Sequence, residues 1–232
     1  TTEGIQAIAR ETAPLLAALE DDVFLDERLF RRVAEVYKRR ARLRLDQVQV
    51  RLVEETWKRF VRGGANLQEA DKKRLREVNR DLSVLGVQFG DHLLGETNAF
   101  RLVIEDPRDL EGIPENFVTA AADAARKAGI QKGWLFTLHG PSLWPFVQNA
   151  RKRELRQRMI EAYAARGDQG NERDNREVVS RIVALRIEKA RLLGYRDWAS
   201  YVLEDRMAGT TGRVMELLDR LWEPALTMAR EE

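Results

Sequence analysis

The chain has 232 residues, 44% hydrophobic and 34% charged, which excludes both a disordered chain and one dominated by membrane spans. Forty basic residues face 38 acidic ones, so the net charge of +2 lacks the basic excess of a general nucleic-acid binder. The absence of cysteine excludes disulfides, thiolate metal ligands and cysteine nucleophiles. We therefore expect a soluble protein that binds neither nucleic acid nor membrane, and its lack of cysteine is compatible with a reducing compartment such as the cytoplasm.

Residues 1–98 carry the periodicity of helices. Amphipathic patterns cover 2–19 and 26–40, and Asp26 is a good N-cap for the second. An apolar stripe then runs from Val50 to Phe60 and ends at Gly63-Gly64, and another from Leu75 to Phe89 predicts a helix to about Thr97. We expect these last two segments to pack as a long antiparallel hairpin that turns at 63–66.

Residues 99–140 predict a small β ribbon with a crossover helix. Arg101–Glu105 and Trp134–Leu138 are rich in branched and aromatic side chains and are bounded by Gly or Pro. Between them, Ile113-Pro114-Glu115 opens a helix that should end at Gly129. Two strands alone are marginally stable, so this ribbon should pack on helices.

Residues 141–232 return to helical patterns. We expect helices at 151–166, 175–193, 197–206 and 214–222, with a polar loop at 168–171 and with Pro224 ending or kinking the last helix. The fold class is therefore mainly α: a multi-helix bundle with a long helical hairpin and a small two-stranded β ribbon.

The two histidines are the first candidates for chemistry. His92 and Glu96 lie four residues apart on one predicted helix face, a spacing that zinc sites use. Zinc needs three or four ligands, and His92 also continues the apolar stripe, so the edge of a packed seam is the favoured interpretation. His139 follows a strand at a turn, where a histidine can act as a catalytic base, but no nucleophile motif lies nearby, so a histidine that hydrogen-bonds the turn is the favoured interpretation.

Other charged groups suit a helical surface. Seven basic residues lie within 31–44 and five within 151–158, and acidic residues accompany both runs, as on a solvated helix face. Glu204 and Asp205 are adjacent on a predicted helix, so their side chains point about 100° apart and do not form a catalytic pair. The loop 167–171 lacks the glycine spacing and lysine of a phosphate-binding loop.

Several stretches resemble the thimet oligopeptidase family of zinc peptidases. The strongest are LLGY (192–195), YVLEDRMA (201–208) and TTGRVMELLDRLWEPAL (210–226). FTLHGPSLWPFVQNARKRELRQRMIEAYAARG (136–167) resembles the family's strand, proline-containing turn and arginine-rich helix. QFGDHLLGETNAFRLVIEDPRDLEGIP (88–114) is similar to the bacterial peptidyl-dipeptidase branch, and the resemblance extends from about Ile5 to the end.

This resemblance implies a single-chain, mostly helical zinc peptidase whose two halves flank a deep cleft that admits short peptides. In the family, an H-E-x-x-H helix and a further Glu in the C-terminal half hold zinc, and the motif's Glu is the general base. No H-E-x-x-H is present in this chain. We therefore expect no catalytic residue and no metal ligand among residues 1–232.

The hypothesis is that the chain is the non-catalytic helical region of a peptidyl-dipeptidase or oligopeptidase. It lacks an initiator Met and stops within a helical pattern, so we expect a piece of a longer, monomeric protein whose zinc and catalytic half lie elsewhere. Five residues are candidates for a wall of the substrate cleft: Tyr195, Tyr201, Glu204, Asp205 and Arg206. Ordinary interdomain packing of these residues is the competing interpretation, and a stand-alone helical protein- or peptide-binding module without catalysis is the alternative function.

Overall fold

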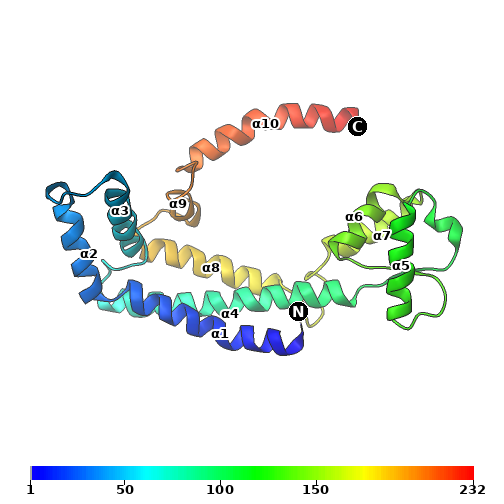
Figure 1. Ribbon diagram of the computed structural model, residues 1–232, viewed down its shortest axis with the longest axis horizontal. Coiled ribbons are helices and arrows are strands. Elements are labelled where there is room, and N and C mark those ends of the chain that lie inside the picture. Colours follow the sequence, from blue (N-terminus) through cyan, green and yellow to red (C-terminus); the bar gives the residue numbers. More distant parts are fainter. Residues whose placement is uncertain (1) are drawn as a thin grey trace. The chain divides into compact units, whose positions relative to one another are not determined.

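A computed structural model describes residues 2–232, which are 73% helical and contain ten α-helices and one small sheet (Figure 1). The mainly α fold class is therefore confirmed. The described chain divides into two compact units. We call residues 2–85 with 181–232 the helical unit, and residues 86–180 the sheet unit. Two long helices, α4 (Glu69–Ala99) and α8 (Arg176–Leu192), contribute to both.

The helical unit begins with α1 (Glu3–Phe24), α2 (Glu27–Arg39), a short 3-10 turn η1 (Arg40–Arg42) and α3 (Gln47–Arg62). The predicted start of α2 and the predicted end of α3 are both present. Asp26 accepts a hydrogen bond from the backbone of Leu29, and α3 ends at Gly63. Asp46 and Gln49 form a capping box that opens α3.

The partner of α3 differs from the one expected. The stripe on α3 packs against α2, where Tyr37 stacks on Trp57 at 4.2 Å between ring centroids and Phe30 stacks on Phe60 at 6.0 Å. The predicted antiparallel pairing of 50–60 with 75–97 is therefore wrong, and α2 with α3 forms the hairpin instead (Figure 1). Both amphipathic stripes satisfy the same periodicity, so the aromatic side chains of α2 decide the pairing.

Within the helical unit, the first half of α4 lies along α1 and α8. Leu75 and Val78 are fully buried there. Arg76 pairs with Asp22 of α1 at 2.7 Å, and Arg74 bonds both carboxylate oxygens of Glu188 of α8 at 2.6 and 3.0 Å. The helices α9 (Trp198–Leu203) and α10 (Thr211–Glu231) follow α8.

The sheet unit is built around the predicted ribbon. The strands β1 (Leu102–Ile104) and β2 (Trp134–Phe136) pair antiparallel, with Val103 opposite Leu135. The 3-10 turn η2 (Pro107–Leu110) and helices α5 (Glu115–Lys127), α6 (Gly140–Asn149) and α7 (Arg153–Ala164) surround them. Leu102, Phe136, Leu143, Phe146 and Met159 form the centre of this core and are at most 2% exposed.

Two expectations about prolines are corrected. Gly140-Pro141 does not form a plain turn but opens α6, because proline suits the first turn of a helix. The Ser142 hydroxyl accepts a hydrogen bond from the Thr137 backbone at 3.0 Å and ties this helix start to the end of β2. At the other end of the chain, α10 runs through Pro224 to Glu231, so the expected helix end at Pro224 is wrong, and the alternative of a kink there stays a prediction.

Two helices of the helical unit leave broad apolar faces exposed. On α1, Ile8, Leu15, Leu16 and Leu19 are each at least 60% exposed. On α10 no residue is buried, and Trp222 is 65% exposed. No helix within residues 2–232 has the length and apolar character needed to cross a membrane.

Candidate functional site

The candidate residues of the cleft wall lie on and beside α9. Gly194 ends α8 with a φ of +81°, and the Tyr195 backbone N–H donates to the Ala190 carbonyl at 2.8 Å. Asp197 then caps α9 by accepting from the Ser200 backbone at 2.7 Å. These two signals, both readable in the sequence, bring the rings of Tyr195 and Tyr201 into an edge-to-face contact at 5.1 Å.

Arg62 at the end of α3 is the centre of this cluster, and sequence reasoning missed it. Its guanidinium donates to the Glu204 carboxylate, to the Tyr201 carbonyl at 2.7 Å and to the Tyr195 hydroxyl at 3.3 Å. The Tyr195 hydroxyl in turn donates to Glu204 at 2.5 Å. The Arg62 guanidinium also lies over the Tyr201 ring, 4.6 Å from its centroid. One side chain thus joins α3 to the α8–α9 connection.

These contacts hold each group in one protonation state. Burial acts to raise the pKa of Glu204, but hydrogen bonds from Tyr195 and Arg62 outweigh it and lower that pKa. Burial and the hydrogen bond to Glu204 raise the pKa of Tyr195 to about 12. Tyr195 is therefore a neutral donor near pH 7 and Glu204 a carboxylate, a pattern typical of a positioning cluster and not of a general acid–base pair.

Asp205 and Arg206 differ in their roles. Lys58 of α3 bonds the Asp205 carboxylate at 2.7 Å and lowers its pKa. The Arg206 side chain makes no hydrogen bond or ion pair with another described residue, and the neighbouring Met207 is fully exposed. The structure therefore brings four of the five candidates together around Arg62 and Lys58, and leaves Arg206 outside that cluster.

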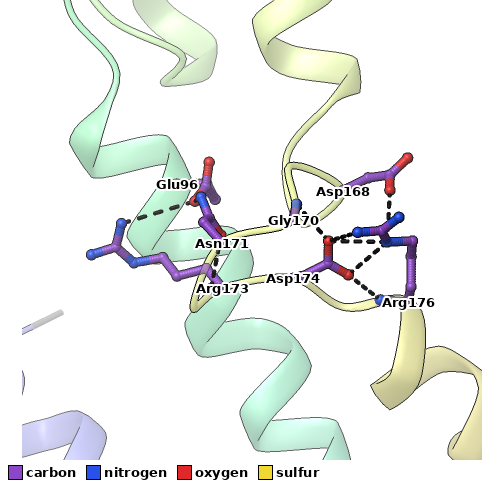
Figure 2. Close-up of polar contacts among 7 residues, drawn as sticks. All are labelled: Glu96, Asp168, Gly170, Asn171, Arg173, Asp174 and Arg176. Atoms are coloured by element: carbon purple, nitrogen blue, oxygen red, sulfur yellow. Dashed lines mark hydrogen bonds and ion pairs between the residues drawn. The ribbon is translucent and has the colours of Figure 1, made fainter.

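His92 and Glu96 do share a helix face, but their partners are amides of the loop between α7 and α8. The buried Glu96 carboxylate accepts from Gln169 at 2.7 Å and Asn171 at 2.8 Å. Arg173 forms an ion pair with the same carboxylate (Figure 2), and the Nη1–Oε1 distance is 3.9 Å. His92 Nδ1 is 2.9 Å from the side-chain oxygen of Asn175. This pair therefore anchors a loop to α4.

The same loop is also held by its own acidic residue. Asp174 accepts from the Gly170 backbone at 2.7 Å and pairs with Arg176 at 2.7 Å, while Asp168 is 3.2 Å from Arg176 (Figure 2). Hydrogen bonds from Arg176 hold the pKa of Asp174 well below its ordinary value. The loop is thus closed by the pairing of Arg176 with Asp168 and Asp174.

The contacts of His139 and of the two basic runs indicate structural roles. His139 is the N-cap of α6, and its carbonyl accepts from the Ser142 and Leu143 backbones at 2.9 Å. Members of both basic runs pair with acids: Arg40 with Glu54 at 3.2 Å, and Lys152 with Asp109 at 2.8 Å. Within residues 2–232, no three His, Cys, Asp or Glu side chains converge as a metal site would require.

Known proteins are similar to nearly the whole chain. The model of Peptidase family M3 matches residues 146–232. The dipeptidyl carboxypeptidase of Salmonella typhimurium is 33% identical over 225 residues, covering 97% of this chain and 33% of that protein. The dipeptidyl carboxypeptidase of Escherichia coli is 32% identical over 232 residues, covering 100% and 34%. Oligopeptidase A of Haemophilus influenzae is 34% identical over 188 residues, covering 79% and 28%.

The chain thus spans about a third of the length of the curated relatives it matches. The family match covers the α6–α10 region, and the two dipeptidyl carboxypeptidases extend the similarity through the sheet unit and the first helices. The chain belongs to Peptidase family M3, the thimet oligopeptidase family, and is similar to its dipeptidyl carboxypeptidase branch.

Proposed function

We propose that this chain is the helical portion of a longer zinc metallopeptidase that hydrolyses short peptides, and that it forms one wall of the substrate cleft. The observation that carries the proposal is the alignment of 97% of the chain with a dipeptidyl carboxypeptidase three times its length. We further propose that the full-length enzyme is monomeric and acts in the cytoplasm. Dipeptidyl versus internal cleavage depends on residues outside the chain.

Zinc, which the family resemblance implies, does not fit the residues of this chain. Both oxygens of Glu96 accept hydrogen bonds from loop amides, and His92 is engaged with Asn175. His139 lies between β2 and α6 and is the N-cap of α6. We therefore place the metal and the catalytic groups in the C-terminal half that the relatives' greater length accommodates, and we assign no catalytic step to this chain.

The exposed apolar helices support this division. A helix within a protein gains most of its stability by packing an apolar face, yet no residue of α10 is fully buried by the rest of residues 2–232. Exposed stripes of this extent mark surfaces that another part of a protein covers. We assign α10 to the contact with the catalytic half, and the neighbouring cluster at Tyr195–Asp205 to the cleft.

Peptide hydrolysis tests the first part of the proposal. The 232-residue chain and the full-length protein are compared on an internally quenched short peptide, with and without a metal chelator. Hydrolysis should require the full-length protein and should stop with the chelator. Chelator-sensitive hydrolysis by the purified 232-residue chain would contradict the assignment, as would a full-length reading frame without an H-E-x-x-H motif.

Thiol protection tests the cleft wall. Because the chain has no cysteine, Met207→Cys introduces one thiol in it beside the Arg62 cluster, at a fully exposed position. In the full-length protein, a bound peptide inhibitor should slow alkylation of this thiol at least tenfold. The matched control is Thr119→Cys on the exposed side of α5, where the inhibitor should have no effect. If the inhibitor left the alkylation rate of Met207→Cys unchanged, or slowed Thr119→Cys equally, the cleft assignment would be wrong.

The exposed face of α10 also supports a second candidate, a helical binding module without catalysis. Trp222 and Leu221 are the kind of anchors that a protein or peptide partner would cover. The two candidates differ in the fate of this face in the full-length protein. Under the peptidase proposal, Trp222 fluorescence is already shielded from acrylamide quenching, whereas under the module it is shielded only after a partner is added.

A further inference from the structure

The helical unit encloses a cavity of about 710 Å³ among α1, α3, α4, α8 and α9. This volume falls within the roughly 300–1,000 Å³ of pockets that bind small molecules. Its lining combines apolar side chains, among them Phe24, Leu52 and Leu82, with equal numbers of acidic and basic side chains. A balanced lining of this kind suits a ligand that carries one charge of each sign.

Most charges around the cavity have an ion-pair partner. Lys58 and Asp205 pair at 2.7 Å, and Arg59 pairs with Glu20 at 3.7 Å. Arg62 is saturated by Glu204 and the two tyrosines described above. These charges stabilise the walls and leave little capacity for a ligand.

Asp21 of α1 and Lys189 of α8 are different. Within residues 2–232, no ion pair shorter than 4.0 Å includes either of them. They share the amide of Asn79 instead, which donates to Asp21 Oδ1 at 2.6 Å and accepts from Lys189 Nζ at 2.6 Å. One carboxylate oxygen and two ammonium protons therefore keep unused hydrogen-bonding capacity beside the cavity.

Burial makes both charges costly at the cavity wall. Asp21 is 6% exposed, and burial raises its pKa although Asn79, Arg76 and Lys189 act in the opposite direction. Burial lowers the pKa of Lys189 although the charges of Asp21 and Glu20 act in the opposite direction. Each group would gain from a charge of opposite sign placed next to it, since a neighbouring counter-charge offsets the loss of water. Perturbed titratable groups that line a cleft are typical of binding sites.

We propose that this cavity binds a dipeptide in its zwitterionic form, with the α-ammonium on Asp21, the α-carboxylate on Lys189 and a side chain against Phe24 and Leu52. The Asn79 amide separates the two charged groups, which matches a dipeptide, whose terminal charges are separated by a peptide bond, better than a single amino acid. The site belongs to the helical unit alone. Its lining shares Tyr201 and Asp205 with the proposed cleft wall, but binding at Asp21 and Lys189 requires neither zinc nor the catalytic half.

Calorimetric titration of the 232-residue chain with L-alanyl-L-leucine tests the site. We expect saturable binding with one dipeptide per chain. Three further probes remove the charges in turn: the N-acetylated dipeptide, the dipeptide amide, and the form with both caps. Each single cap should weaken binding at least tenfold, and the doubly capped form should not bind. A free amino acid is a zwitterion too, so L-leucine serves as a comparison and should bind more weakly than the dipeptide.

Two variants locate the site. Asp21→Asn keeps an acceptor for Asn79 and should weaken dipeptide binding at least tenfold, as should Lys189→Met. The matched control is Asp22→Asn, which changes the adjacent exposed carboxylate that pairs with Arg76 and lies outside the cavity lining. It should bind as the parent does. No saturable binding of the dipeptide, binding that the caps do not change, or equal binding by Asp21→Asn would each overturn the proposal. The capped probes test the parent chain and do not depend on how the variants fold.

Discussion

In the sheet unit, Phe136, Phe146 and Met159 are almost completely enclosed by the ribbon and three helices, whereas Trp222 of the helical unit is 65% exposed on a helix without a packing face. Most of the buried hydrophobic side chains belong to the shorter sheet unit, and most of the exposed large ones belong to the helical unit. The sheet unit thus has a core of its own. The outer helices of the helical unit expose apolar side chains that are typical of a protein core. We therefore expect the surface that covers them to lie outside this chain.

The largest expected effect comes from truncating a core side chain of the sheet unit. Phe146→Ala should destabilise the sheet unit by about 3–5 kcal/mol, because it leaves a cavity in a fully packed site. Trp222→Ala should change the free energy of unfolding by less than about 0.5 kcal/mol. Urea unfolding with hydrogen exchange of the β1 and β2 amides measures both. A large loss in Trp222→Ala would show that the face of α10 is already covered.

The next effect concerns the charged centre of the helical unit. Arg62→Met should cost about 1–3 kcal/mol, because Glu204 and the Tyr201 carbonyl lose a shared donor. Arg62→Lys should recover only part of this, since one ammonium cannot satisfy three acceptors in the geometry of a guanidinium. The control Lys58→Met breaks a half-exposed ion pair and should cost less than about 1 kcal/mol. Equal losses in Arg62→Met and Lys58→Met would contradict a central role for Arg62.

Glu96 is the corresponding anchor in the sheet unit. Glu96→Gln sets an NH2 group against the donor amides of Gln169 or Asn171, which should cost about 1–3 kcal/mol and release the loop. Amide exchange and protease cleavage within 168–175 measure that release. Glu172→Gln is the matched control, because the Glu172 side chain is 80% exposed. Unchanged exchange in Glu96→Gln would mean that Asp174 and Arg176 hold the loop alone.

The smallest effects are pH-dependent and have opposite signs in the two units. Burial raises the pKa of Asp21, so the folded state keeps this proton to higher pH and stability falls as the pH rises through the interval between the unfolded and folded pKa values. Arg176 lowers the pKa of Asp174, so its contribution is present above the ordinary carboxyl pKa and is lost as the pH falls.

Two substitutions separate these signs. At pH 7, Asp21→Asn should be at least as stable as the parent chain, and Asp174→Asn should be less stable. Both differences should shrink as the pH falls towards 3, because Asp21 then becomes protonated in the folded chain and Asp174 in the unfolded chain. Thermal unfolding between pH 3 and pH 8 measures the two curves. A gain from Asp174→Asn at pH 7, or a loss from Asp21→Asn that persists in acid, would contradict the assigned surroundings of these carboxylates.

Local chemistry determined most of the elements of this fold. The cap at Asp26, the helix end at Gly194 and the branched residues of both strands are signals within a few residues of the structure they specify, so sequence patterns predicted them. The helix α6 was missed because a Gly-Pro pair fits a turn and a helix start equally well. The family was also predicted from the sequence, because several stretches that resemble it occur in the same order along the chain.

Only the tertiary structure decided which faces meet and which charges pair. The α3 stripe suited α4 as well as α2 by periodicity, and the aromatic contacts with α2 settled the choice. Arg62 and Glu204 lie 142 residues apart, and Glu96 and Asn171 lie 75 apart. No local pattern encodes such pairs, because a charged side chain accepts any partner of suitable sign and the fold alone determines which one is within reach.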